Sequence, residues 1–128
     1  MGLIVLCLAT PLRADDLRPV PDYFVDTVFL TSTAQTIARA CSTLSLDPAA
    51  TTRLTETVLA RLEADGYTSD VIATGMDDPG PAIAALQEAF LAKHDLADGA
   101  PEPQVCAAGR AEIAGDTPLG HLMLEVAE

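Results

Sequence analysis

The chain has 128 residues, of which 19 are acidic and 7 are basic, so its formal net charge is -12 at pH 7. This charge opposes binding to nucleic acid and to anionic membrane surfaces, and the lack of tryptophan leaves few rings on which bases or sugars stack. The length suits one domain, and a hydrophobic content of 49 % argues against disorder.

The first 14 residues have the pattern of a secretory signal peptide. The apolar run from Gly2 to Ala9 is shorter than the roughly 18 apolar residues that span a bilayer, and Ala14 is a small residue suited to cleavage. No Lys or Arg precedes this run, which a start codon placed too late would explain. The alternative is a retained, buried N-terminal strand or helix. We predict a signal peptide over 1–14, a linker over 15–21, one helical domain over 22–128, and a periplasmic or secreted location.

The first predicted helix begins after Pro21, where Asp22 can accept hydrogen bonds from the free amides of the first turn. It ends near Cys41. The Ser- and Thr-rich middle, 31–36, forms helix weakly and predicts a kink. One face carries the apolar residues Val25, Val28, Phe29, Ile37 and Cys41.

The second predicted helix has the clearest boundaries in the chain. Asp47 and Pro48 have the residue types of an N-cap and a first helical position. Gly66 is suited to a left-handed stop, and Tyr67 can then contact Leu62 in a Schellman-type closure. The apolar residues Leu54, Val58 and Leu62 recur at a spacing of four.

Two further helices are predicted in the middle of the chain. Ser69 can cap a short third helix that Gly75 ends. Asp78 and Pro79 repeat the cap-and-proline signal for a fourth helix. Its apolar stripe contains Ile83, Leu86 and Phe90, with His94 at its end. Residues 95–103, rich in glycine and proline, are predicted to form a loop.

The C-terminal part predicts a fifth and a sixth helix. The fifth begins near Pro103, places Cys106, Gly109 and Ile113 on one face, and ends at Gly115. The sixth begins at Thr117–Pro118 and carries Leu119, Leu122, Met123 and Val126. No segment alternates with the period of two that a sheet needs. The predicted fold class is therefore all-α, a small array or bundle of five to six short helices.

The three cysteines divide between the leader and the folded body. Cys7 leaves with the signal peptide, whereas Cys41 and Cys106 remain and are expected to pair in an oxidising compartment. Because Cys41 and Cys106 are far apart in sequence, a bridge between them would stabilise the chain by about 4 kcal/mol in the chain-entropy model. The alternatives are two buried free thiols or a redox-active pair, although catalytic dithiols are usually Cys-x-x-Cys.

A set of short motifs spread along the chain resembles an uncharacterised family of short exported alphaproteobacterial proteins, which is defined only as a domain of unknown function. The resemblance covers about residues 20–124. It implies the helical fold, the cysteine pair and export, and it brings no activity. The chain departs from the family in having fewer Lys and Arg and a Thr- and Ala-rich second helix. The motifs that carry the resemblance are Pro21, Cys41, Gly66-Tyr67, Asp77-Asp78, Cys106, Gly109, Glu112-Ile113 and Gly120-His121-Leu122.

The polar residues have structural interpretations that we prefer to catalytic or metal-binding ones. His94 and His121 lack the clustered spacing of metal ligands and are expected to be exposed or at helix ends. Gly109 is expected to permit a close helix crossing or to make room for the disulfide rather than to line a ligand groove. Arg110 and Glu112 are two residues apart and do not face each other, so each is solvated or reaches another helix. We predict no catalytic residue, no metal and no cofactor.

The preferred function is an exported helical domain without catalytic machinery that binds a protein partner or supports an envelope complex. The candidate contact surface is the last predicted helix, with Leu119, Leu122, Met123, Leu124 and Val126. The alternative is a periplasmic carrier of a small molecule or metal, with a cavity between the first, fourth and fifth helices lined by Phe29, Phe90 and Ile113. An enzyme would instead require a buried titratable cluster in a cleft.

Overall fold

The structure is a computed structural model, and it describes residues 17–127. The predicted leader, with Cys7 and Ala14, lies outside the described residues. Five α-helices dominate the chain: α1 (Asp22–Ala40), α2 (Pro48–Ala64), α3 (Ser69–Thr74), α4 (Gly80–Lys93) and α5 (Glu102–Ala114). A short strand and a final turn and strand complete it: β1 (Leu44–Leu46), the 3-10 helix η2 (Gly120–Leu122) and β2 (Met123–Glu125). The mainly helical fold class is confirmed, with a small sheet added to it.

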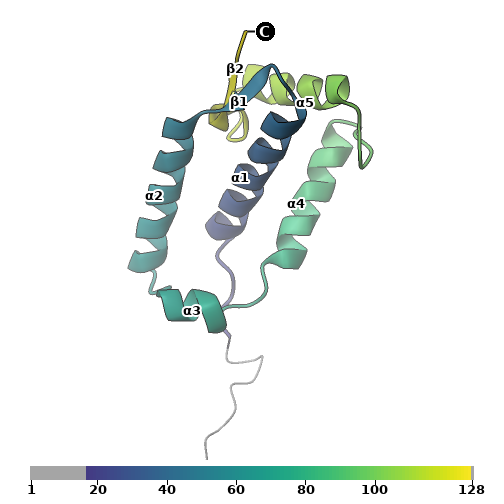
Figure 1. Cartoon of the computed structure of the whole chain (residues 1–128). Coiled ribbons are helices and arrows are strands. Elements are labelled where there is room, and N and C mark those ends of the chain that lie inside the picture. The colour runs from purple at the N-terminus through teal and green to yellow at the C-terminus, as the bar shows by residue number, and fades with distance from the viewer. Residues whose placement is uncertain (1–16, 128) are drawn as a thin grey trace, which may run out of the picture.

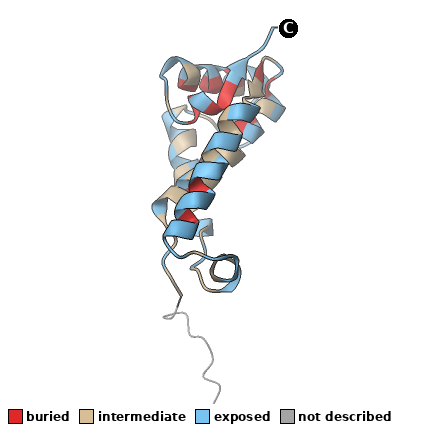
Figure 2. Cartoon of the chain, turned by 90° about the vertical axis from the view of Figure 1, so that its left-hand side faces the viewer, coloured by how far each residue is buried: buried red, intermediate tan, exposed pale blue. Residues whose placement is uncertain are grey.

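Helix α1 is the centre of the fold. It lies between α2 and α4, while α3 joins these two helices at one end of α1 and α5 crosses the other end together with the sheet (Figure 1). Buried residues gather at the end that holds α5 and the sheet (Figure 2). The core cluster there consists of Ala34, Ile37, Cys41, Leu44, Cys106, Leu119, Leu122 and Met123. Helix α4 contains no buried residue, so its contact with α1 leaves open hollows.

The ends of α2 form as the sequence predicts. The Asp47 carboxylate accepts a hydrogen bond from the amide of Ala50 at 3.1 Å, and Pro48 opens the helix. At the other end Gly66 has a φ of +80°, which glycine adopts without the steric cost of a side chain. The amide of Tyr67 donates to the carbonyl of Leu62 at 2.8 Å, which completes the Schellman closure.

Other helix ends differ from the prediction in detail. Thr68, not Ser69, caps α3, because its hydroxyl accepts from the amide of Val71. Pro21 occupies the N-cap of α1, so Asp22 lies in the first turn. Helix α1 is continuous through 31–36, and threonine hydroxyls such as Thr36 donate back to carbonyls of the same helix.

The prediction of a sixth helix is wrong. Its segment forms η2 and then β2, which pairs antiparallel with β1 so that Leu46 opposes Met123. The apolar spacing of this segment fits a helix, but in a run this short it also fits a turn followed by a strand. The backbone groups of this segment pair with β1 and the residues next to it. For example, the amide of Val126 donates to the carbonyl of Thr43 at 2.9 Å.

The disulfide between Cys41 and Cys106 is confirmed. It joins the C-terminal end of α1 to α5 across a Cα separation of 5.3 Å, and both cysteines are buried. Gly109 lies one turn further along α5, where a β-carbon would come within 2.9 Å of the Ile37 side chain and would also overlap that of Leu44. The close packing predicted for Gly109 is therefore present.

The described part of the predicted N-terminal linker is attached to the domain. The Arg18 guanidinium donates to the carbonyls of Gly66 at 2.7 Å and Asp65 at 2.9 Å, and it lies 3.9 Å from the centre of the Tyr67 ring. The backbone of Arg18 also forms a parallel bridge with Met76. These contacts fix the entry to α1 at the end of the molecule that holds α3.

Candidate functional site

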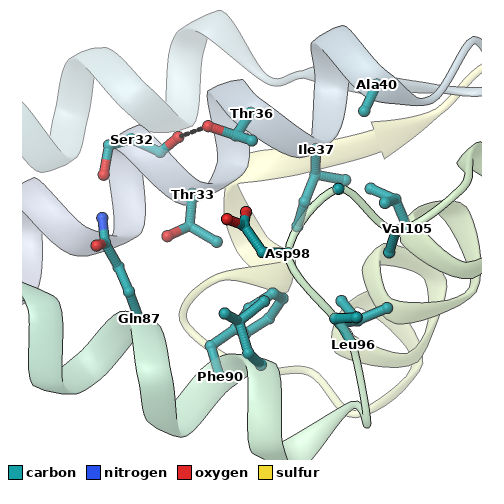
Figure 3. A pocket seen from close by; sticks show the side chains of 14 residues that line it. Ser32, Thr33, Thr36, Ile37, Ala40, Gln87, Phe90, Leu96, Asp98 and Val105 are labelled. Atoms are coloured by element: carbon teal, nitrogen blue, oxygen red, sulfur yellow. Dashed lines mark hydrogen bonds between the residues drawn. The ribbon is translucent and has the colours of Figure 1, made fainter.

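A cleft of about 430 Å³ opens between α1 and α4, closed at one end by the loop that leads to α5. We call it the α1–α4 cleft (Figure 3). Its lining is mainly apolar, with a few polar groups along α1 and α4. The lining residues are Ser32, Thr33, Thr36, Ile37, Ala40, Gln87, Phe90, Leu91, Leu96, Ala97, Asp98, Gly99, Ala100 and Val105. A partly apolar hollow of this size matches the sites in which proteins hold small molecules.

Phe90 separates the α1–α4 cleft from a second hollow of about 330 Å³. Its ring meets that of Phe29 edge-on at 6.3 Å between centroids and lies 4.7 Å from the ring of His94. The sequence placed a carrier cavity between the corresponding helices, lined by Phe29, Phe90 and Ile113. Both phenylalanines line the second hollow, whereas Ile113 packs against the core instead.

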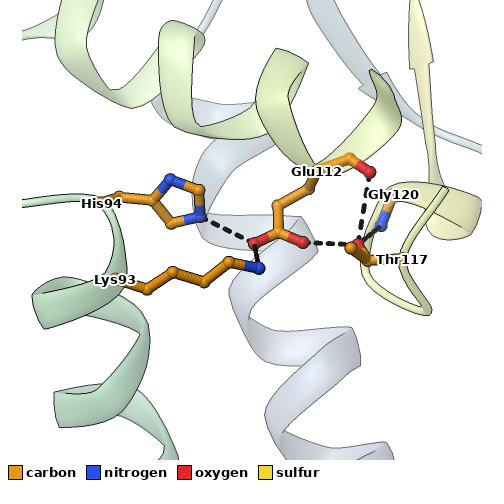
Figure 4. A network of polar contacts seen from close by, with 5 residues as sticks. All are labelled: Lys93, His94, Glu112, Thr117 and Gly120. Atoms are coloured by element: carbon orange, nitrogen blue, oxygen red, sulfur yellow. Dashed lines mark hydrogen bonds and ion pairs between the residues drawn. The ribbon is translucent and has the colours of Figure 1, made fainter. Parts of the chain in front are cut away.

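A buried carboxylate, Glu112 of α5, lies at the edge of the second hollow (Figure 4). One of its oxygens accepts hydrogen bonds from the Lys93 ammonium at 2.8 Å and from Nε2 of His94 at 2.7 Å. The other oxygen accepts from the hydroxyl of Thr117, which in turn accepts from the amide of Gly120 at 3.0 Å. This Glu112 network ties the end of α4 and the turn before η2 to α5.

The network decides the charge of Glu112. Burial by itself raises the pKa of this carboxyl, but the hydrogen bonds from Lys93, Thr117 and His94 outweigh burial and lower the pKa to about 2. Because an ionised carboxylate only accepts hydrogen bonds, Nε2 of His94 must carry the proton between them. Each Glu112 oxygen already has a donor, so the arrangement fits a structural clamp better than a general base.

Replacing Glu112 by glutamine is expected to lower the free energy of unfolding at neutral pH by about 2 kcal/mol, since hydrogen bonds to a charged acceptor are lost. The pKa of Glu112 is depressed in the folded chain, from 4.5 to about 2, so its contribution is complete above pH 4.5. It is lost as the pH falls from 4.5 through about 2. Urea unfolding at a series of pH values should show the difference between wild type and Glu112→Gln shrinking over that interval.

A matched control uses Glu88, an exposed carboxylate on the same helix as Lys93. Glu88→Gln removes the same charge without touching the network, so its stability should follow the wild type at every pH. A difference between wild type and Glu112→Gln that stays constant down to pH 2 would contradict a depressed pKa for Glu112.

The two histidines lie in different surroundings. His94 ends α4 and is nearly buried beside Glu112, with 11 % of its side chain exposed, so the expectation of a helix-end position is met. His121 is exposed and contacts the carboxylate of Asp116 at 2.5 Å. Neither histidine shares a partner with the other. The sequence did not predict the Glu112 network, although the placement of His94 at the end of an apolar stripe was a hint.

A carboxylate, that of Glu102, lies next to the disulfide. Within the described residues, the carboxylate of Glu102 and the sulfurs of Cys41 and Cys106 lie within 4.8 Å of one another, a spacing that a metal ion could use. The sulfurs are bonded to each other, so they are not available as thiolates. Glu102 instead accepts from the amide and hydroxyl of Ser42, and these bonds lower its pKa. The group fastens the start of α5 to the end of α1.

The surface predicted for a protein partner is largely absent. Leu119, Leu122 and Met123 are each only 3 % exposed, because η2 and β2 turn them into the core beneath α5. Leu124 and Val126 are exposed, at 47 % and 40 %. The prediction is therefore corrected: three of the five predicted residues form core, and Leu124 and Val126 remain outside.

Comparison with known proteins adds a family match to this geometry. A model described as a family of unknown function, DUF5333, matches residues 17–124. Neither the curated proteins nor the solved structures include a significant match to the chain. Within residues 17–127, no helix has the length and apolarity required to cross a membrane.

Proposed function

The chain belongs to DUF5333, a family of unknown function, and we propose that it is an exported binding protein of the cell envelope without catalytic activity. The observation that carries this proposal is the α1–α4 cleft, whose size and mainly apolar lining suit a small molecule with an apolar part. The disulfide supports an oxidising compartment, periplasmic or secreted.

The Glu112 network supports a binding role rather than catalysis. Both oxygens of Glu112 accept hydrogen bonds from protein groups, and Glu112 lines the second hollow rather than the α1–α4 cleft. A catalytic acid or base needs a proton-accepting or proton-donating atom that faces the substrate. Here the polar side chains that line the cleft belong to other residues, among them Thr33, Gln87 and a single carboxylate, Asp98.

Binding can be tested with N-phenyl-1-naphthylamine, a neutral dye that fluoresces in apolar surroundings. We expect the dye to bind the wild type and Thr33→Phe to weaken binding about tenfold, a change of roughly 1.4 kcal/mol, because Thr33 lines the centre of the cleft (Figure 3). The matched control is Gln35→Phe, at an exposed position on α1 that does not line the cleft. Equal binding by both variants would remove the cleft as the site.

A protein partner is the second candidate function, and the exposed pair Leu124 and Val126 favours it. Leu124 lies within β2 and Val126 directly follows it, in a sheet of only two strands. The dye experiment separates the two candidates. Dye binding that survives Thr33→Phe but is lost when Leu124 and Val126 are both replaced by lysine would locate the apolar contact at this strand and favour a partner.

A further inference from the structure

We infer that the α1–α4 cleft selects an organic cation, namely an ammonium group carried on an apolar chain. This inference rests on the proposed function, because it names the class of ligand for the same cleft. Among the described residues that line the cleft, Asp98 alone has an ionisable side chain. Its carboxylate points into the cleft toward α1 (Figure 3). An ammonium at this position would gain a charge-assisted hydrogen bond, whereas a carboxylate would meet repulsion.

The loop that carries Asp98 is held by its own backbone. The amide of Leu96 donates to the carbonyl of Leu91 at 2.8 Å, and the amide of Ala100 donates to the carbonyl of Ala97 at 3.1 Å. Gly99 has a φ of +75°, which lets the chain turn directly after Asp98. The carboxylate is therefore placed over the cleft by a defined turn (Figure 3).

Two of the three hydroxyl groups that line the cleft, those of Ser32 and Thr36, act as acceptors. The Ser32 hydroxyl donates its proton to the carbonyl of Phe29 at 3.2 Å, and the Thr36 hydroxyl donates to the carbonyl of Ser32 at 2.9 Å. Each hydroxyl has a single proton, so only lone pairs remain for a ligand. A ligand that supplies donors, as an ammonium does, complements these two hydroxyl groups better than one that supplies acceptors.

The rest of the cleft and the charge of the chain agree with this choice. Ile37, Phe90 and Val105 give the cleft an apolar floor that suits an alkyl chain. The formal net charge of -12 draws cations toward the protein and repels anions. Lys and Arg side chains are absent from the described residues that line the cleft, so nothing there compensates Asp98.

The test compares three ligands that share one alkyl chain: octylammonium, octanol and octanoate. Each is titrated into the isotopically labelled full chain at neutral pH and physiological salt, and the dissociation constant is read from the chemical shifts of Ile37 and Phe90. We expect octylammonium to bind about fivefold more tightly than octanol, since one partly exposed ion pair contributes about that much, and octanoate to bind most weakly. Asp98→Asn should make octylammonium and octanol bind equally.

Glu88→Gln is the matched control, because it removes one exposed carboxylate from α4 without changing the lining of the cleft. It should leave the preference for octylammonium intact. Equal binding of octylammonium and octanol to the wild type, or a preference that persists in Asp98→Asn, would overturn the inference while the proposed function stands. No shift at Ile37 and Phe90 with any of the three ligands would overturn both.

Discussion

Replacing Cys41 and Cys106 together by alanine is expected to lower the free energy of unfolding by about 4 kcal/mol, the largest effect that we predict. The two bridged cysteines are 65 positions apart in sequence, so removing the bridge gives the unfolded chain many more conformations. It also joins the end of α1 to α5 within the core cluster. Such a loss approaches the roughly 5 to 15 kcal/mol of net stability of an ordinary domain.

Urea unfolding of the oxidised wild type and the double variant measures this effect. Dithiothreitol provides the matched control: it should lower the stability of the wild type by a similar amount and leave Cys41→Ala/Cys106→Ala unchanged. A double variant that loses less than about 1 kcal/mol would show that the core, and not the bridge, fastens α5 to α1.

Gly120→Ala is expected to cost about 3 kcal/mol, the second largest effect. Gly120 is buried where η2 lies against the backbone of α5. A β-carbon there would lie 2.5 Å from the carbonyl carbon of Glu112 and 2.8 Å from the amide nitrogen of Ile113. These are backbone atoms of a helix, so they cannot move aside as a side chain does. The added methyl group must therefore push η2 away from α5.

The matched comparison is Gly109→Ala, which makes the same change on α5 itself. The nearest atoms to the β-carbon of that variant belong to the side chains of Leu44 and Ile37 rather than to backbone, so its cost should be smaller. Thermal unfolding of the two variants beside the wild type measures the difference. A cost for Gly120→Ala equal to or below that of Gly109→Ala would contradict the close backbone contact.

Both predictions concern the end of the molecule where the disulfide and η2 lie, and the α1–α4 cleft lies beside this well-packed end. The disulfide and the contact of η2 with α5 hold the core cluster together at one end of α1. Helix α4 leaves that core and contributes no buried residue of its own. Its position depends on α1 and on the clamp that Glu112 makes with Lys93 and His94. The cleft therefore has as one wall helix α1, which the disulfide joins to α5.

Features that depend on neighbouring residues were predictable. The start of α2 at Asp47 and its stop at Gly66 follow from hydrogen bonds that span three to five residues. The pairing of Cys41 with Cys106 followed from the prediction that Cys7 belongs to a signal peptide, which assigns two cysteines to the folded domain.

The site was only partly predictable. A cavity bounded by Phe29 and Phe90 followed from their shared stripes on two helices, but the larger cleft required the path of the loop that carries Asp98. Two partners of Glu112, His94 and Lys93 at the end of α4, lie 18 and 19 residues away, and no spacing rule connects positions so far apart. The residues at 119, 122 and 123 were misread because three apolar positions do not distinguish a helix from a turn and strand.

The sequence by itself determined the five helices and most of their ends, because caps, glycine stops and helical periodicity act within a few residues. It also indicated the disulfide, since Cys41 and Cys106 are the cysteines of the predicted domain. Only the tertiary structure decided which apolar side chains are core, that the last segment pairs with β1, and that Glu112 meets His94. These outcomes depend on contacts between distant parts of the chain. Their free energy comes from burial and from pairing of backbone groups, to which local patterns do not respond.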